Sequence, residues 1–369
     1  MVRELLKNLG YNEKESEQVL NHEGLCNLKE ETLLKNIKRN YQYFEKILGY
    51  TNEEIIKMSL STPVIYTYNI EAIEEKRKAL EDMGFTKENL KQMYKAFPSI
   101  FSLSIENNIR EKRERMLLLG YSDEAFRKII KHTPAIISYS IESIEKRVMD
   151  MKRIGYPKEI FIKMTIQFPP LYNLSIENIE KRIKDMEEMG YLKDEFINMS
   201  IKLPSIFGYN LESMKKKKQE FISLGYKEED FVKMTKTLPA IYSYNIETVK
   251  NKIATLKKYG YSDEEVKTIT TIYPAIFGTS NESLNRKIVL LENIGIKDII
   301  IKDPRKLMQS FELTYARYKY LQEHGLEISS ENYRTIYQSE KEFVKKYGVE
   351  KKELFKKVGI LEDVKEQNK

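Results

Sequence analysis

The sequence predicts an all-α fold, a right-handed α-solenoid or superhelix of about 8–9 repeats of about 35 residues each. A glycine recurs with gaps of 35 residues and one gap of 36, at Gly49, Gly84, Gly120, Gly155, Gly190, Gly225, Gly260 and Gly295. A proline follows each of the first seven glycines by 14 residues, at Pro63, Pro98, Pro134, Pro169, Pro204, Pro239 and Pro274. A fixed period of this size is typical of stacked repeats, so we expect the 369 residues to form one array.

The residues after each glycine predict a short amphipathic helix, as the repeat at Gly120 illustrates. Ser122 is a favourable N-cap residue, and the acidic residues after it suit the positive end of the helix dipole. Phe126 and Ile129 lie at helical spacing and give the helix one apolar side. Pro134 ends this helix, because proline lacks the backbone N–H donor and clashes with the preceding turn.

A second, longer helix follows the proline in each repeat. Residues 134–139 are too few for an α-helix and predict a turn of 3-10 helix. Ser140 then supplies an N-cap, and Gly155 ends the helix because glycine adopts a left-handed C-cap with little strain. The apolar positions between them are Ile141, Ile144, Val148, Met151 and Ile154. Neither helix can bury its apolar side alone, so neighbouring repeats must stack.

The regular pattern weakens at both ends of the chain. We expect a degenerate capping repeat over residues 1–48, because no proline lies between Gly10 and Gly49. Seven regular repeats follow over 49–294, and a shortened repeat occupies 295–325 with Pro304 displaced. Residues 326–369 are rich in Lys and Glu and predict a helical C-terminal cap with a loose tail.

Composition excludes several classes of function. Cys26 is the only cysteine, so neither an intrachain disulfide nor a cysteine-based metal cluster can form. The histidines lack the spacing of metal ligands, and no catalytic triad or phosphate-cradling glycine loop is recognisable. No apolar stretch reaches the roughly 18 residues of a membrane span. We therefore expect a non-enzymatic protein without cofactors, and the formal net charge of +7 does not alone indicate a polyanionic partner.

A basic residue lies eight positions before the glycine that ends each regular repeat, and also before Gly325. This ladder consists of Lys76, Lys112, Arg147, Arg182, Lys217, Lys252, Lys287 and Arg317. The N-terminal unit departs from the rule with Tyr41. Each ladder residue lies at the edge of the apolar side of the second helix, so its stem can be buried while its charge reaches out. A regular row of such charges suits a phosphate backbone, and we predict that the ladder binds nucleic acid.

A structural role is the alternative for the ladder, whose residues could pair with an acidic residue of a neighbouring repeat. The glutamate near the start of the second helix is not expected to be the partner within the same helix. Glu142, for example, is placed to pair with Lys146 four residues later. The aromatic residue after most of the glycines, such as Tyr121, could stack on bases, but packing between repeats is the favoured interpretation.

The repeat unit L-G-Y-x-x-E…P-x-I-x-x-Y-x-I-E-x-I-x-x-[KR]…L-x-x-x-G resembles that of the mitochondrial transcription termination factor (mTERF) family over about residues 49–325. The resemblance implies two helices and a 3-10 turn per repeat, arranged in a curved superhelix. It also implies binding of nucleic acid, mostly double-stranded DNA, along a basic groove, with roles in organelle transcription, replication or ribosome assembly rather than in catalysis.

We therefore predict a monomeric nucleic-acid-binding protein of the transcription regulation or termination type, with double-stranded DNA favoured, RNA as an alternative and no membrane partner. A protein-binding scaffold is the competing hypothesis, as for other helical repeat arrays. The N-terminal residues resemble neither a secretory signal nor a typical transit peptide, which predicts a cytoplasmic, bacterial-type location. The alternative is a mitochondrial or plastid location after removal of a targeting peptide.

Overall fold

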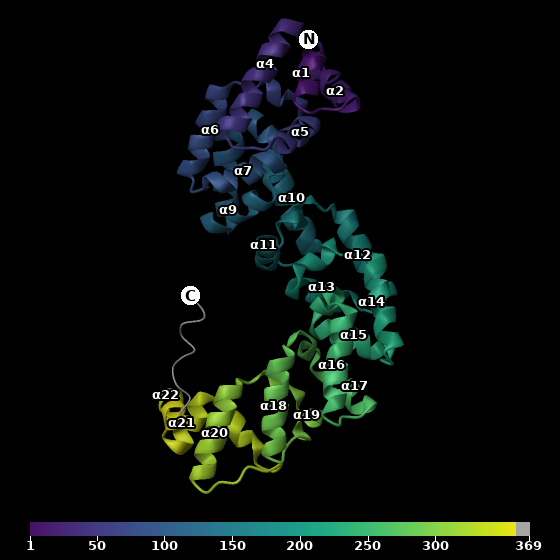
Figure 1. The fold of residues 1–369 in the computed structure, drawn as a ribbon, viewed down its shortest axis with the longest axis vertical. Helices are drawn as coiled ribbons and strands as arrows, with labels where there is room; N and C mark the ends of the chain where they lie inside the picture. Colours follow the sequence, from purple (N-terminus) through teal and green to yellow (C-terminus); the bar gives the residue numbers. More distant parts are fainter. Residues whose placement is uncertain (359–369) are drawn as a thin grey trace. The chain divides into compact units, whose positions relative to one another are not determined.

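The computed structural model describes residues 1–358, and every regular element in that range is helical, which confirms the all-α repeat architecture. The chain divides into two compact units, Met1–Lys184 and a second that begins at Asp185. The boundary falls inside helix α12 (Ile176–Glu188), and each unit is described by itself (Figure 1). Of the predicted C-terminal cap and tail, residues 359–369 lie outside the described range.

The first unit begins with four helices and then alternates first and second helices of the repeats. The four are α1 (Val2–Asn8), α2 (Glu13–Leu20), α3 (Glu23–Cys26) and α4 (Glu30–Gln42). The first helices of the repeats are α5 (Asn52–Ser61), α7 (Lys87–Ala96), α9 (Asp123–His132) and α11 (Lys158–Gln167). The second helices are α6 (Ile70–Asp82), α8 (Glu111–Leu118), α10 (Ile141–Ile154) and α12. The 3-10 turns that join them are η2 (Pro63–Thr67), η3 (Pro98–Ser102), η5 (Pro134–Ser138) and η6 (Pro169–Asn173).

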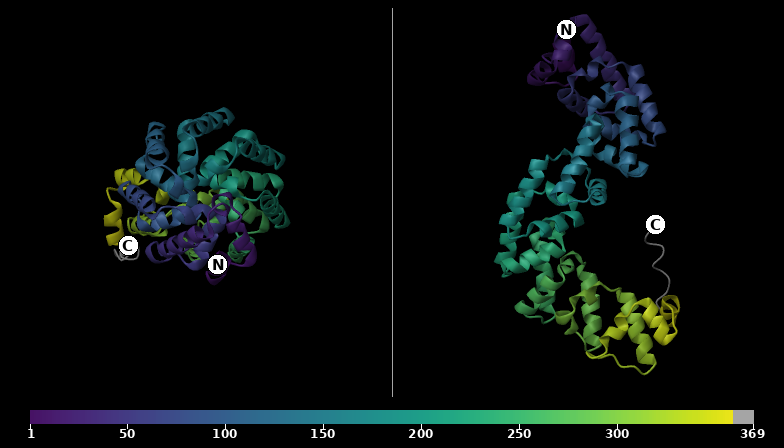
Figure 2. Two further views of the ribbon diagram at one scale, coloured as in Figure 1. Left: turned by 90° about the horizontal axis from the view of Figure 1, so that it is seen from above. Right: turned by 180° about the vertical axis from the view of Figure 1, so that it is seen from behind.

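The second unit continues the same alternation. Its first helices are α13 (Lys193–Lys202), α15 (Glu228–Thr237), α17 (Asp263–Ile272) and the short α19 (Ile299–Lys302). Its second helices are α14 (Leu211–Ser223), α16 (Ile246–Lys258), α18 (Asn281–Asn293) and α20 (Phe311–Glu323). The turns are η7 (Pro204–Gly208), η8 (Pro239–Ser243), η9 (Pro274–Gly278) and η10 (Pro304–Met308). The turn η11 (Tyr333–Tyr337) and helices α21 (Glu340–Tyr347) and α22 (Lys351–Lys357) follow, and α22 packs against α20 (Figure 2).

The predicted helix signals operate as expected. The Ser122 side chain accepts a hydrogen bond from the Ala125 backbone N–H and caps α9, and Ser140 caps α10 in the same way. Each proline turn is a 3-10 helix that begins at the proline. Gly155 adopts φ 118° at the end of α10, in the left-handed region that a side chain would strain. First helices of successive repeats pack together within each unit, as α7 does against α9 and α15 against α17.

Two π-helical turns account for the irregular spacings of the repeat. The turn η4 (Ile105–Arg110) precedes α8 and absorbs one extra residue, which explains the single gap of 36 residues between Gly84 and Gly120. The turn η1 (Tyr43–Ile47) follows α4 and adds a residue before Gly49. The frame counted back from Gly49 is therefore shifted by one position in the N-terminal unit.

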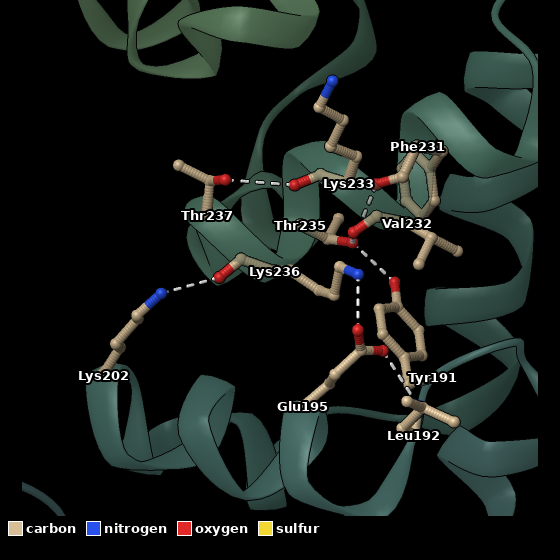
Figure 3. A network of polar contacts seen from close by, with 10 residues as sticks. All are labelled: Tyr191, Leu192, Glu195, Lys202, Phe231, Val232, Lys233, Thr235, Lys236 and Thr237. Atoms are coloured by element: carbon tan, nitrogen blue, oxygen red, sulfur yellow. Dashed lines mark hydrogen bonds and ion pairs between the residues drawn. The ribbon is translucent and has the colours of Figure 1, made fainter.

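Buried hydroxyl groups join successive repeats. The Tyr121 hydroxyl bonds to the Thr165 hydroxyl at 2.9 Å and the Tyr172 hydroxyl at 2.6 Å, both in the next repeat. In the second unit Tyr191 makes the equivalent contacts with Thr235 and Tyr242, each at 2.6 Å. Figure 3 shows the Tyr191–Thr235 contact beside the ion pair of Glu195 with Lys236. The aromatic residue after the glycine thus packs between repeats, as the favoured interpretation predicted, and its hydroxyl has a protein partner.

One interface uses no hydroxyl groups at these positions. Phe85 replaces the tyrosine, and the two equivalent positions of the next repeat are Ile130 and Ile137, both fully buried. At this interface neither repeat contributes a hydroxyl group at these positions. This agreement avoids a buried hydroxyl without a partner.

Candidate nucleic-acid interface

Five ladder residues are tied to the next repeat by hydrogen bonds to backbone carbonyl groups. Lys76 Nζ donates to the Phe101 carbonyl at 2.6 Å, and Lys112 Nζ donates to the Tyr139 carbonyl. The other three ties join Lys252 Nζ to the Thr279 carbonyl at 2.6 Å, Lys287 Nζ to Leu307 at 2.7 Å, and Arg317 Nη1 to Ile336 at 3.3 Å and Gln338 at 2.5 Å. Each acceptor lies in or just after the 3-10 turn of the following repeat. These residues therefore cap the carbonyl ends of turns.

Three of these five side chains are deeply buried, and Lys76 and Lys287 are half-buried. Lys112, Lys252 and Arg317 are only 3%, 2% and 3% exposed. Desolvation lowers the pKa of all five side chains, because burial disfavours the charged form: Lys76, Lys112, Lys252, Lys287 and Arg317. The carbonyl contacts occupy part of the donor capacity of each group. These contacts favour a structural role for the five residues over a role in binding a ligand. Their partners are backbone carbonyl groups of the next repeat rather than the acidic side chains that the alternative proposed. Their contact with phosphate stays a prediction.

The N-terminal unit has a ladder member that the sequence frame missed. Asn40, not Tyr41, occupies the position, because the π-helical turn η1 shifts the register by one residue. Asn40 Nδ2 donates to the carbonyls of Ile65 at 2.8 Å and Tyr68 at 3.0 Å, and Asn40 is fully buried. The uncharged Asn40 amide thus donates to carbonyl groups at the next turn, as the tied lysines do. In the N-terminal unit the contact between repeats is therefore made by a hydrogen-bond donor without a positive charge.

The three remaining ladder residues differ from these. Lys217 makes an ion pair with Glu220 on its own helix at 2.6 Å. Arg182 is half-buried. Arg147 is also half-buried, and its Nη1 atom is buried without a hydrogen-bond partner.

A second row of cations lies one position before the ladder. Lys146, Lys181 and Lys216 are exposed, and none of them makes an ion pair or hydrogen bond within residues 1–358. We call these three residues the outer lysines. The first two lie on α10 and α12 in the first unit, and the third lies on α14 in the second. One residue of helix corresponds to a rotation of about 100°, which moves the side chain from the inter-repeat contact to solvent.

The predicted pairing of the outer lysines with the glutamates four residues earlier does not form. Glu212 pairs with Lys215 at 3.1 Å instead of with Lys216. Hydrogen bonds from its own backbone N–H and from the Ser140 hydroxyl lower the pKa of Glu142, with further help from the charge of Lys112 in the preceding repeat. These carboxylates stay at the helix N-termini, where the helix dipole favours them. The outer lysines are left without that partner.

An open depression of about 280 Å³ lies between α10 and the turn before α12. Its polar lining comes from Tyr139, Ser143, Arg147, Asn173 and Ser175. Tyr139 donates a hydrogen bond across it to Asn173 Oδ1 at 3.1 Å. No carboxylate group lines the depression.

Two further findings bear on the class of protein. Among the residues with described positions, no group of three or more His, Cys, Asp or Glu side chains could hold a metal ion. A search for helices that are long and apolar enough to cross a bilayer finds none between residues 1 and 358.

The stacked helix pairs, proline turns and basic second helices define a helical-repeat protein of the α-solenoid class. The mTERF family model matches residues 3–184 and 172–344, which together cover most of the chain. The chain therefore belongs to the mTERF family, whose members are nucleic-acid-binding helical-repeat proteins. No curated protein matches the sequence.

Proposed function

We propose that this protein binds nucleic acid through the outer lysines, with duplex DNA as the favoured partner and transcription regulation or termination as its role. Membership of the mTERF family supports nucleic acid as the partner. The observation that supports the site is the exposure of Lys146 and Lys181, on the second helices of consecutive repeats, neither of which makes an ion pair among the described residues. Unpaired ammonium groups can release counterions from a phosphate backbone when they bind it, which drives association.

The spacing of the repeats also supports a polyanionic partner. Lys146 and Lys181 occupy the same position of consecutive repeats, so they give the first unit two like charges that follow the repeat. Lys216 gives the second unit a cation at the same repeat position. Contacts of this kind position a protein on a nucleic acid but do not read its sequence.

The test compares two pairs of substitutions that remove the same charge. One variant carries Lys146→Gln and Lys181→Gln. The matched control carries Lys128→Gln and Lys163→Gln on α9 and α11, the first helices of the same two repeats, where both lysines are exposed and make no ion pair among the described residues. Fluorescence anisotropy with duplex DNA, single-stranded DNA and RNA measures each affinity at two salt concentrations.

We expect the outer-lysine variant to bind duplex DNA roughly tenfold more weakly, equivalent to about 1.4 kcal/mol, while the control binds as the unsubstituted protein does. Equal losses in both variants would reject a defined site on the second helices. Stronger binding of RNA than of duplex DNA would change the favoured partner. Absence of binding to all three nucleic acids at moderate salt would favour the protein-binding scaffold.

A further inference from the structure

Arg147 differs from the five tied ladder residues, because its Nη1 atom is buried without a hydrogen-bond partner among the described residues. Five ladder residues donate to carbonyl groups of the next repeat and Lys217 pairs with Glu220, whereas the Arg147 Nη1 atom has no partner. The type of side chain does not explain this difference, because Arg317 makes the tie to two carbonyls. A buried N–H donor without an acceptor is unfavourable, so an acceptor from outside the chain would be stabilised there.

The surroundings of Arg147 fit an anion with several oxygen atoms. The depression of about 280 Å³ provides hydroxyl groups from Ser143 and Ser175 and the side chain of Asn173. Ser175 begins the 13-residue helix α12, whose N-terminus carries partial positive charge. The guanidinium fork matches two oxygens of a phosphate group. Lys146, the preceding residue, adds a second positive charge.

One acidic residue competes at this position. Glu177 lies in the first turn of α12, where its own backbone N–H and the Ser175 hydroxyl lower its pKa and the charges of Arg147 and Lys146 add to the shift. Glu177 is exposed and does not line the depression. Glu142 occupies the equivalent position one repeat earlier, beside Lys112, whose ammonium group is already bonded to a carbonyl. The two glutamates therefore differ in whether the neighbouring ladder cation is already bonded to a carbonyl of the next repeat.

We propose that the depression at Arg147 is a phosphate-binding subsite, with the Arg147 guanidinium as its principal donor and Ser143, Asn173 and Ser175 in its polar lining. The inference rests on the proposed function in one respect, since the source of the phosphate is taken to be the backbone of the nucleic acid held by the outer lysines. A free phosphate ion or a terminal phosphate monoester offers the same chemistry.

The test uses the full chain labelled with ¹⁵N-arginine and inorganic phosphate as the probe, at constant ionic strength. We expect a saturable shift of the Arg147 Nε–H signal, which is assigned by its absence in Arg147→Lys. Glu177→Gln should tighten the apparent phosphate affinity by roughly threefold or more, whereas Glu142→Gln should leave it unchanged. A signal that does not respond to phosphate, or an equal effect of both glutamate variants, would overturn the subsite.

A second arm identifies the source of the phosphate. Arg147→Gln should weaken duplex binding several-fold and reduce the salt slope by about one, and Arg147→Lys should restore part of the affinity. Loss of duplex binding in the outer-lysine variant but not in Arg147→Gln would overturn the subsite and leave the proposed function standing. A saturable phosphate shift in a protein that binds no nucleic acid would support the subsite for free phosphate and reject the proposed function.

Discussion

The ladder and the outer lysines occupy adjacent positions of the same helices, yet they face different surroundings. In the first unit Lys112 is 3% exposed and bonded to the next repeat, while Lys146 is exposed and makes no ion pair in the described part of the chain. The ladder is basic in all seven regular repeats, whereas the preceding position is Glu in two repeats, Lys in three, Asn in one and Arg in one. The more uniform position holds the contact between repeats in five of the eight ladder residues. The variable position is free to serve a partner.

The largest expected effect is a difference in folding stability between a substitution in the ladder and a substitution of an outer lysine. Lys112→Met keeps the stem of the side chain but leaves the Tyr139 carbonyl without a donor, which should lower the free energy of unfolding by about 1–3 kcal/mol. Lys146→Met at the exposed position should change it by no more than about 0.5 kcal/mol. Urea unfolding of both variants measures the difference. Equal midpoints would show that the ladder contacts do not hold repeats together.

The next effect tests whether the ladder needs a donor or a charge. Asn40→Leu removes two hydrogen bonds to the turn after α5 without changing the net charge, and we expect a loss of about 1–2 kcal/mol. Asn40→Lys should lose less, because an ammonium group can donate to the same carbonyls. An unchanged unfolding midpoint for Asn40→Leu would contradict the assignment of this residue to the ladder.

A smaller effect comes from the buried hydroxyl groups at the interfaces. Burial raises the pKa of Tyr191 and of Tyr226 to about 12, above the value of about 10 for tyrosine in an unfolded chain. The folded state thus keeps these protons longer, so their contribution to stability is complete below pH 10. It falls by about 1.4 kcal/mol per pH unit for each group as the pH rises from about 10 to 12.

Unfolding midpoints between pH 9 and 12 and the ultraviolet absorbance of tyrosinate measure this loss. Tyr226→Phe removes one such group and should make the decline shallower over the same interval. A decline of the same steepness in that variant would exclude Tyr226 as a source of the pH dependence.

Much of the fold could be predicted from the sequence because its signals are local. Ser122, Pro134 and Gly155 each act through the backbone near them, so the helices, turns and caps follow from residue type alone. The orientation of the ladder could not be predicted in this way. Whether Lys112 faces a ligand or the Tyr139 carbonyl depends on how two repeats pack, and helical spacing places a side chain only at the edge of the apolar side.

The position of the ladder residue in the N-terminal unit also could not be predicted from local signals. A π-helical turn leaves the residue types unchanged but shifts the frame, so Tyr41 was the wrong position and Asn40 holds the contact. The gap of 36 residues between Gly84 and Gly120 was the visible sign of the other such turn, η4. The residue that η1 adds before Gly49 gives no such sign, because the helices between Gly10 and Gly49 do not follow the regular spacing.

The salt dependence of duplex DNA binding tests the central claim most directly. The affinity is measured over a series of salt concentrations for the unsubstituted protein, for Lys146→Gln/Lys181→Gln, and for Lys76→Met/Lys112→Met under conditions where that variant remains folded. We predict that the outer-lysine substitutions reduce the slope of log affinity against log salt concentration by about two, while the ladder substitutions leave it unchanged. A reduced slope in the ladder variant with an unchanged slope in the outer-lysine variant would contradict this account and return the phosphate contacts to the ladder.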